Sequence, residues 1–251
     1  MTPRKRSPLA IETTDAHLCS ISLRLKILGQ VPFFRGLAAS DQAWINSLFR
    51  EKDFETDEVI CLSGDPAEQL FVIADGRVRL LRHSLDGREI LLDLLTPGEF
   101  FGALSGLGND VYPETAQAHS SCCILLIDRE AFRKVLERYP AIALKLIDII
   151  AGRLRIANER VHQLSALSVE ARIASILLML ADKFGEKKGT ECLLQVPLSR
   201  ENLAGMTGAT IESASRVMSR FQKGGLIHSG RGWVAVIDRA GLEVIAGNAA
   251  E

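Results

Sequence analysis

The sequence of 251 residues has little of what marks a secreted or membrane-inserted chain. Behind the basic residues at positions 4 to 6 there is no apolar stretch of about 7 to 15 residues, which a secretory signal requires. The most apolar segment, Ile142 to Ile150, is interrupted by Lys145 and Asp148 and is too short to span a bilayer. These absences predict a cytoplasmic protein that does not associate with membranes.

Cysteine is scarce, and its spacing follows no pattern. The five cysteines are odd in number and include no CxxC pair, which argues against a disulfide framework. We expect reduced thiols at Cys19, Cys61, Cys122, Cys123 and Cys192. Cys122 and Cys123 fall in a predicted strand, so at least one of them should point into the core as a small apolar side chain. A redox role for Cys61 or for the Cys122–Cys123 pair stays open.

An excess of charge of one sign is also missing, since the formal net charge is -1. A nucleic-acid binder of this composition needs a locally concentrated basic surface. The sequence contains no nucleophile elbow, P-loop, HExxH motif or paired-carboxylate constellation, which predicts that the chain is not an enzyme. Hydrophobic residues at 47% and charged residues at 24% are ordinary for a globular protein, and the length allows one large domain or two modest ones.

Glycine turns divide the first half of the chain. Ser40 is predicted to cap a short helix over Asp41 to Phe49. From Phe54 to Asp128, β-rich runs alternate with turns such as Asp75-Gly76 at intervals of about ten residues. This punctuation is typical of an antiparallel sandwich or barrel.

A long helix is predicted to follow from Pro140, a favoured first helical residue. Apolar residues then recur with alternating spacings of four and three, the a/d pattern of a helix that pairs with another helix. This seam predicts a homodimer through Ala143, Ile147, Ile150, Leu154, Ala157, Val161 and Leu164. The alternative is a helix that packs only on its own β domain. Ile142, Leu146 and Ile149 form a second stripe for that contact, so one helix can serve both partners.

The last third of the chain has the layout of a winged helix-turn-helix. Ser168 to Phe184 predicts a helix, and Gly185 to Thr190 predicts a polar loop. Two helices follow around the turn glycine Gly208, and then a hairpin around positions 229 to 232. Small or apolar residues fall where the two helices must touch, namely Leu203, Ala204, Ala209, Ala214 and Val217. From this spacing alone, an ordinary helical hairpin is the alternative.

Polar side chains on the second of these helices indicate DNA binding. Thr210 can cap this helix, which places Glu212, Ser215 and Arg216 at i, i+3 and i+4 on one exposed face. Arg can bind guanine O6 and N7, Glu can accept from cytosine N4, and Ser can serve either base. The segment from Ser199 to Arg231 contains five basic and two acidic residues, so its formal net charge is +3. The predicted DNA-binding residues are Arg200, Thr210, Glu212, Ser213, Ser215, Arg216, Arg220, Lys223 and Arg231, of which Arg220, Lys223 and Arg231 would contact phosphates.

These features together resemble the superfamily of the cyclic AMP receptor protein and FNR. The resemblance rests on the spaced glycines of the β domain, the helix ending in GRLRIANERVHQLS and the segment TIESASRVMSRFQKGGLI. The N-terminal sequence itself predicts a mobile segment over 1–30. The resemblance implies an α+β protein with a β-roll sensor domain over 31–139, a jelly roll like the cyclic nucleotide-binding domain. A dimerisation helix over 140–165 and a winged helix-turn-helix over 166–251 complete the expected organisation.

The resemblance also implies a function. Members of this superfamily bind a palindrome as homodimers and recruit RNA polymerase, and in FNR-type members the Glu, Ser and Arg that match Glu212, Ser215 and Arg216 read a half-site like TTGAT. We therefore expect a transcription activator, with polymerase contacts from the hairpin Arg82 to Arg88 and the loop Lys183 to Cys192. The competing hypothesis is a ligand-binding regulatory module whose helix-turn-helix serves only protein contacts.

The signal is not named by the resemblance, because this fold hosts many ligands. The expected effector pocket comprises Phe101, Ala103, Leu104, Glu114 and Thr115. Members that bind cyclic AMP need a Glu for the ribose and an Arg for the phosphate. Ala103 stands where that Glu would be, and Pro113 or Glu114 stands where that Arg would be. Cyclic AMP is therefore not expected, because its phosphate would be buried without a cationic partner.

Two metal cofactors of the superfamily remain to be weighed. An iron-sulfur cluster is not expected, because Cys19 is the only cysteine near the N-terminus, where FNR itself has three of its four thiolate ligands. Haem stays open, since ETAQAHSSCCILLIDREAF resembles the nitric-oxide-responsive Dnr and Nnr branch, whose members use haem. The candidate axial ligands are His17, His83, His119 and His162.

Overall fold

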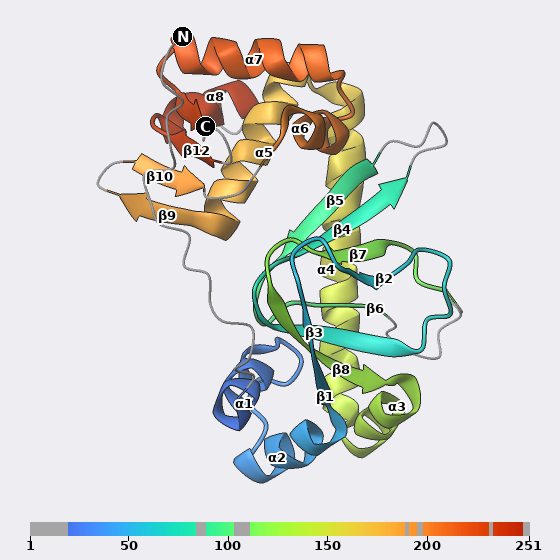
Figure 1. The fold of residues 1–251 in the computed structure, drawn as a ribbon. Helices are drawn as coiled ribbons and strands as arrows, with labels where there is room; N and C mark the ends of the chain where they lie inside the picture. Colours follow the sequence, from blue (N-terminus) through green and yellow to red (C-terminus); the bar gives the residue numbers. More distant parts are fainter. Residues whose placement is uncertain are drawn as a thin grey trace. The chain divides into compact units, whose positions relative to one another are not determined.

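The computed structural model describes residues 20–83, 89–102, 111–188, 191–194, 198–230 and 233–247. These residues divide into two compact units, one ending at Leu154 and the other beginning at Arg155. Figure 1 shows a β-rich unit, coloured blue to yellow, and a mainly helical unit, coloured yellow to red. Within the described parts of the chain, no helix is both long and apolar enough to cross a membrane.

The first unit contains two four-stranded antiparallel sheets, with strand orders β1-β8-β3-β6 and β2-β7-β4-β5. Their strands are β1 (Arg50–Phe54), β2 (Val59–Cys61), β3 (Gln69–Asp75), β4 (Val78–His83), β5 (Glu89–Leu95), β6 (Phe100–Gly102), β7 (Thr115–Ala118) and β8 (Cys122–Asp128). One core cluster takes residues from both sheets, including Phe71, Phe101, Val78 and Ala116. The predicted antiparallel β-roll is confirmed.

The central strands β3 and β8 are buried on both faces. Alternate residues of β3 point to opposite sides, so Leu70 belongs to one core cluster and Phe71 to the other. In β8, Cys122 and Cys123 divide in the same way, and both are buried, which confirms that at least one points into the core. Burial on both faces accounts for the continuous apolar runs in these two strands.

Helices cover the outer face of the sheet that contains β3 and β8. They are α1 (Ile21–Gln30), α2 (Ala39–Leu48), α3 (Arg129–Arg138) and the start of α4 (Pro140–Ala166). Aromatic rings fill the space between these helices and the sheet. The ring of Phe33 lies edge-on against Phe100 of β6, with 4.9 Å between the ring centroids, and 6.0 Å from Phe132 of α3.

The predicted mobile segment over 1–30 is wrong for its last ten residues. Ser20 caps α1 by accepting a hydrogen bond from the backbone N–H of Leu23, and Ile27 and Leu28 are buried in the core. Arg24 holds this helix to the end of α2 by donating to the carbonyl oxygens of Asn46 and Phe49, at 3.0 and 2.7 Å. Residues 1–19 lie outside the described residues.

The start of α2 also differs from the prediction. Ser40 does not cap a helix over Asp41 to Phe49, because α2 begins at Ala39 and Ala38 occupies the cap position. The carbonyl oxygen of Ala38 accepts from the backbone N–H groups of both Asp41 and Gln42, so the first turn closes without a side-chain cap.

Helix α4 begins at the predicted Pro140 and carries two different apolar stripes. Ile142 and Leu146 are buried in the core of the first unit, as the second stripe predicts. In the predicted seam, Ile147 and Leu154 are each 60% exposed. The boundary between the two compact units falls inside this helix, after Leu154, and the first half of the helix packs on the β-roll.

Among the described residues, the second unit contains the end of α4, four further helices and one sheet with the strand order β11-β12-β10-β9. Its elements are α5 (Val169–Phe184), β9 (Gly185–Lys188), β10 (Glu191–Leu194), α6 (Arg200–Thr207), α7 (Ile211–Lys223), β11 (Ile227–Gly230), β12 (Trp233–Val236) and α8 (Arg239–Ala246). Ser168 caps α5 by accepting from the N–H of Ala171, as the predicted start of this helix requires.

The polar loop predicted over Gly185 to Thr190 is wrong for its first four residues. Gly185–Lys188 form the edge strand β9, which pairs antiparallel with β10 and places Gly185 opposite Leu194. An edge strand pairs through its backbone and can carry a polar sequence, so hydropathy does not reveal it. Residues 189 and 190 lie outside the described part of the chain.

Candidate nucleic-acid interface

The predicted helix-turn-helix is formed by α6 and α7. Ser199 and Asn202 form a reciprocal capping box at the start of α6, and α6 ends at Gly208, whose φ of 61° and ψ of 31° are left-handed. Thr210 then caps α7 by accepting from the backbone N–H of Ser213 at 3.1 Å. The predicted turn glycine and the predicted cap are both confirmed.

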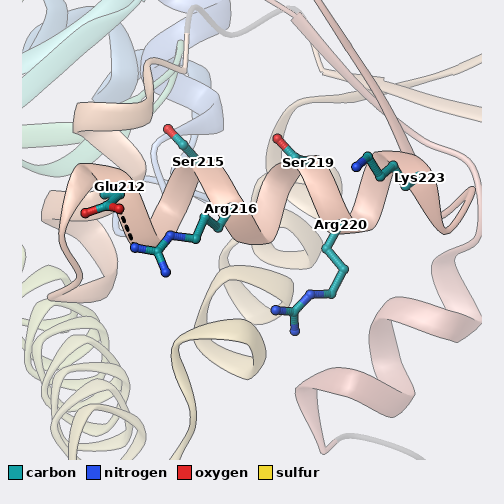
Figure 2. A pocket seen from close by; sticks show the side chains of 6 residues that line it. All are labelled: Glu212, Ser215, Arg216, Ser219, Arg220 and Lys223. Atoms are coloured by element: carbon teal, nitrogen blue, oxygen red, sulfur yellow. Dashed lines mark hydrogen bonds and ion pairs between the residues drawn. The ribbon is translucent and has the colours of Figure 1, made fainter.

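One face of α7 is buried and the opposite face is open. Ala214, Val217, Met218 and Phe221 are buried, and Leu203 and Ala204 of α6 are buried as well. A shallow open groove on the exposed face is lined by Glu212, Ser215, Arg216, Ser219, Arg220 and Lys223, which we call the recognition face (Figure 2). The packing of α7 against its own unit thus leaves its polar residues free for a partner.

The recognition face contains the three predicted base-reading residues together. Glu212 and Arg216 form an i,i+4 ion pair at the start of α7, drawn as a dashed line in Figure 2. Ser215 lies beside them on the helix surface. Sequence reasoning missed Ser219, although it lies four positions after Ser215 and three after Arg216, the spacing of residues on one helix face. It also passed over Ile211, which is 47% exposed at the first position of α7.

Predicted phosphate contacts differ in their surroundings. Arg220 donates from Nη1 to Oε2 of Glu170 on α5, at 2.6 Å. Lys223 is exposed in the last turn of α7. Arg231 lies outside the described residues, so its placement at the tip of the predicted wing is not described.

Arg200, the first residue of α6, is half-buried and reaches strand β11. Its Nη2 donates to Oγ of Ser229 at 3.4 Å, and that hydroxyl donates in turn to Oε1 of Gln222 on α7, at 3.1 Å. Burial lowers the pKa of the Arg200 guanidinium from its usual value. This chain of hydrogen bonds connects the start of α6, the wing strand and the recognition helix.

The predicted effector pocket is described only in part, because Ala103 and Leu104 lie outside the described residues. Phe101 is buried and stacks on Phe71, with 4.9 Å between centroids. The hydroxyl of buried Thr115 accepts from the backbone N–H of Ser63 at 3.1 Å. Burial raises the pKa of the half-buried Glu114 carboxyl, and Arg82 and Arg153 act in the opposite direction.

Candidate metal ligands do not gather in the described regions. No group of three or more His, Cys, Asp and Glu side chains there could hold a metal ion. Nε2 of His83 lies 3.7 Å from Oε1 of Glu89, and Nδ1 of the exposed His162 lies 3.9 Å from Oε1 of Glu159. His119 is half-buried, and burial lowers its pKa to about 4, so this imidazole is neutral and could ligate a metal on protonation state alone. His17 falls outside the described residues.

Two of the described free cysteines, Cys61 and Cys122, are held as thiols, whereas Cys123 is disulfide-bonded, so the expected reduced thiol at Cys123 is wrong. Burial raises the pKa of Cys61 to about 11 and that of Cys122 to about 12. A reactive cysteine needs the opposite shift, because the thiolate is the nucleophile. These two sites therefore favour a packing role over redox chemistry.

Comparison with known proteins agrees with this geometry. Residues 51–139 match the family model of the cyclic nucleotide-binding domain, and residues 171–245 match that of the Crp-like helix-turn-helix domain. The chain is 33% identical over 215 residues to the cyclic AMP receptor protein of Thermus thermophilus, covering 86% of this chain and 96% of that protein. It is 28% identical over 200 residues to the transcriptional activator protein FnrA of Stutzerimonas stutzeri, covering 80% and 82% of the two chains.

A solved structure shows the same fold. The structure of FixK2 from Bradyrhizobium japonicum superposes with a TM-score of 0.69 at 26% identity, covering 81% of this chain and 98% of that chain. The relatives are transcription regulators and not enzymes. With its cyclic nucleotide-binding-like β-roll and its DNA-binding helix-turn-helix, this chain belongs to the CRP/FNR family of transcription regulators.

Proposed function

We propose that the protein is a homodimeric activator in the cytoplasm that reads a TTGAT-like palindrome through α7 and contacts RNA polymerase. The observation that carries this proposal is the grouping of Glu212, Ser215 and Arg216 on the exposed face of a capped recognition helix. Residues at the N-terminal end of a recognition helix are those that meet base edges in the major groove.

The three side chains supply a pattern of donors and acceptors. Arg216 can donate two hydrogen bonds to guanine O6 and N7, and Glu212 can accept from a cytosine N4 amino group. In the free protein these two groups satisfy each other as an ion pair. An exposed pair of this kind contributes only about 0.3 to 0.5 kcal/mol, so base contacts can replace it.

Dimerisation is supported by the exposed stripe on α4. Ile147, Ile150, Leu154, Val161 and Leu164 are 40 to 62% exposed, and all belong to the predicted seam. A row of large apolar side chains open to water on one helix is typical of an interaction surface. A second copy of the same helix would bury this row by knobs-into-holes packing.

The alternative, in which the helix-turn-helix serves protein contacts only, is less well supported. A helix that docks on a protein groove presents apolar anchors at i, i+3, i+4 and i+7. Ile211 is the one large apolar side chain exposed on α7 within the described residues. Polymerase contacts stay assigned to the hairpin Arg82 to Arg88, of which residues 84–88 lie outside the described chain, and to the segment Lys183 to Cys192.

We infer that the signal is not cyclic AMP, although relatives carry that name. Glu114, a half-buried carboxyl group, occupies or adjoins the place where a phosphate-binding Arg is needed, and an anion there would meet another anion. Titration calorimetry with cyclic AMP should show no binding, and saturable binding would overturn this inference.

Haem or redox signalling is tested by absorption spectra and intact mass of natively purified protein. A Soret band would support haem, and its absence after haem reconstitution would exclude it.

The proposed DNA sequence is tested by Arg216→Ala. Loss of the guanine contacts should cost about 1 to 3 kcal/mol on a TTGAT palindrome and relax the preference at the guanine position, measured by fluorescence anisotropy on a set of single-base variants. Arg216→Lys is the matched control, because it keeps the charge and loses the bidentate fork. An equal loss on every sequence would show that Arg216 contacts only phosphate.

A further inference from the structure

Two cations lie in the C-terminal half of the recognition face, and they differ in their partners. Arg220 Nη1 lies 2.6 Å from Glu170 Oε2, whereas Lys223 has no ion-pair partner among the described residues. Figure 2 shows the Arg220 side chain extending to one side of α7, away from the hydroxyl groups of Ser215 and Ser219. Lys223 is therefore available to a DNA phosphate, and Arg220 is bound within its own unit.

Glu170 is the less exposed member of this pair. It lies in the first turn of α5, where the helix dipole stabilises a carboxylate. Its side chain is 29% exposed, against 75% for Glu212, so solvent screens the Glu170–Arg220 pair less than the Glu212–Arg216 pair. The nearby Arg172 is committed to three backbone carbonyl oxygens, so it does not compete for Glu170.

The pair lowers the cationic character of the recognition face. With Arg216 bound to Glu212 and Arg220 bound to Glu170, two of its three cations are neutralised by carboxylates of the same unit. Glu212 can itself contact a base, but Glu170 lies on α5, outside the recognition face. Its carboxylate therefore acts on DNA binding through Arg220.

We propose that Glu170 is a positioning residue that limits sequence-independent DNA binding by holding Arg220 away from the phosphate backbone. Phosphate contacts strengthen binding to every duplex and carry no sequence information, so this restraint should weaken binding to all sequences alike. The proposal rests on DNA binding by α7 but not on the TTGAT sequence assigned to it.

The test is Glu170→Gln in the full-length protein, with a random-sequence duplex and a TTGAT palindrome as probes. We expect tighter binding to both probes at low salt and an unchanged ratio between them. Between about 50 and 200 mM salt, the affinity of the variant should fall about threefold more than that of the wild type, which is the loss produced by one additional phosphate contact.

Two controls separate this restraint from simple removal of a negative charge. In an Arg220→Gln background, Glu170→Gln should change neither the affinity nor its salt dependence. Glu201→Gln removes an exposed carboxylate from the first turn of α6, for which the described residues include no ion-pair partner, and it should leave the salt dependence unchanged. A steeper salt dependence in either control, or none in Glu170→Gln, would overturn the proposal.

A further comparison covers the case in which Glu170→Gln does not fold, as judged by circular dichroism. Lys223→Gln should reduce the slope of log affinity against log salt by about 0.9, because it removes a phosphate contact. Arg220→Gln alone should leave that slope unchanged, and a matching reduction would refute the restraint. If the wild type does not prefer the palindrome over random duplex, the proposed DNA sequence fails while this comparison still decides the role of Glu170.

Discussion

The guanidinium of Arg172 joins α5 to the end of α6, with Nε donating to the carbonyl oxygen of Thr207 at 2.8 Å. Its Nη1 also donates to the carbonyl oxygens of Leu167 and Leu164, at 2.8 and 3.2 Å. The last carbonyl groups of a helix accept no hydrogen bond from an N–H group of the same helix, so they need donors from outside it. One side chain satisfies the ends of both α4 and α6 beside the recognition helix.

Replacing this side chain should destabilise the second unit. Arg172→Ala is expected to lower its free energy of unfolding by about 2 kcal/mol, because partly buried carbonyl groups lose charged donors. Urea denaturation followed by Trp233 fluorescence in a Trp44→Phe background reports on this unit. Arg172→Lys should show an intermediate loss, since an ammonium group lacks the planar fork. Wild-type stability in Arg172→Ala would contradict the assignment.

Arg200 should contribute to affinity without contributing to sequence preference. Arg200→Ala is expected to weaken binding to the palindrome and to random duplex by the same factor and to leave the salt slope unchanged, because the half-buried guanidinium is hydrogen-bonded to Ser229 within its own unit and supplies no phosphate contact. Anisotropy titrations at several salt concentrations measure both quantities. Ser229→Ala removes the hydrogen-bond partner of Arg200 and serves as the control. A loss confined to the palindrome would indicate that Arg200 acts on base recognition.

The exposed seam of α4 should hold the dimer together. Ile150→Asp or Leu154→Asp would bury an unpaired charge in that interface, at a cost of several kcal/mol, and should give a monomer in sedimentation velocity. Ile156 is a suitable control, because it is 57% exposed on the same helix but lies outside the predicted seam. A dimer that survives both seam changes, or is lost in Ile156→Asp, would place the interface on another face.

The first unit should lose stability in mild acid because of His119. Burial, and then the charges of Arg79 and Arg77, lower its pKa to about 4, with Asp57 acting in the opposite direction. The histidine of an unfolded chain has a pKa of about 6.5, so below that pH the unfolded chain takes up a proton that the folded chain does not. Stability is therefore present above about pH 6.5 and is lost as the pH falls toward 4.

From pH 7 to pH 5, the free energy of unfolding of the first unit should fall by about 1 kcal/mol, after allowance for the partial exposure of His119. Urea denaturation followed by Trp44 fluorescence in a Trp233→Phe background measures it. His119→Gln is neutral at both pH values and should lack this part of the pH dependence. An identical dependence in the variant would assign the effect to other groups.

Local rules explain why much of the recognition site could be predicted. A cap such as Thr210 and a left-handed turn such as Gly208 depend on residues within four positions of each other. The spacing of Glu212, Ser215 and Arg216 places them on one face of any α-helix. The same rule applies to Ser219, which was passed over although its spacing contained the signal.

Elements stabilised by distant contacts could not be predicted in this way. Helix α1 has only two buried residues, and Arg24 ties it to carbonyl groups more than twenty positions away. Strand β9 is polar and pairs at the edge of a sheet, so its hydropathy resembles that of a loop. In both cases the partner that stabilises the segment is remote in sequence, and no periodicity records it.

The amino-acid sequence by itself determined the order of the domains, the two stripes of α4 and the polar residues of the recognition helix, because helical and strand periods set which residues share a face. Only the tertiary structure decided which cations of that helix are free. Glu170 and Arg220 are fifty positions apart, and the packing of α5 against α7 brings them to 2.6 Å. The charge available to DNA is therefore a property of the folded unit, since ion pairs form between neighbours in space.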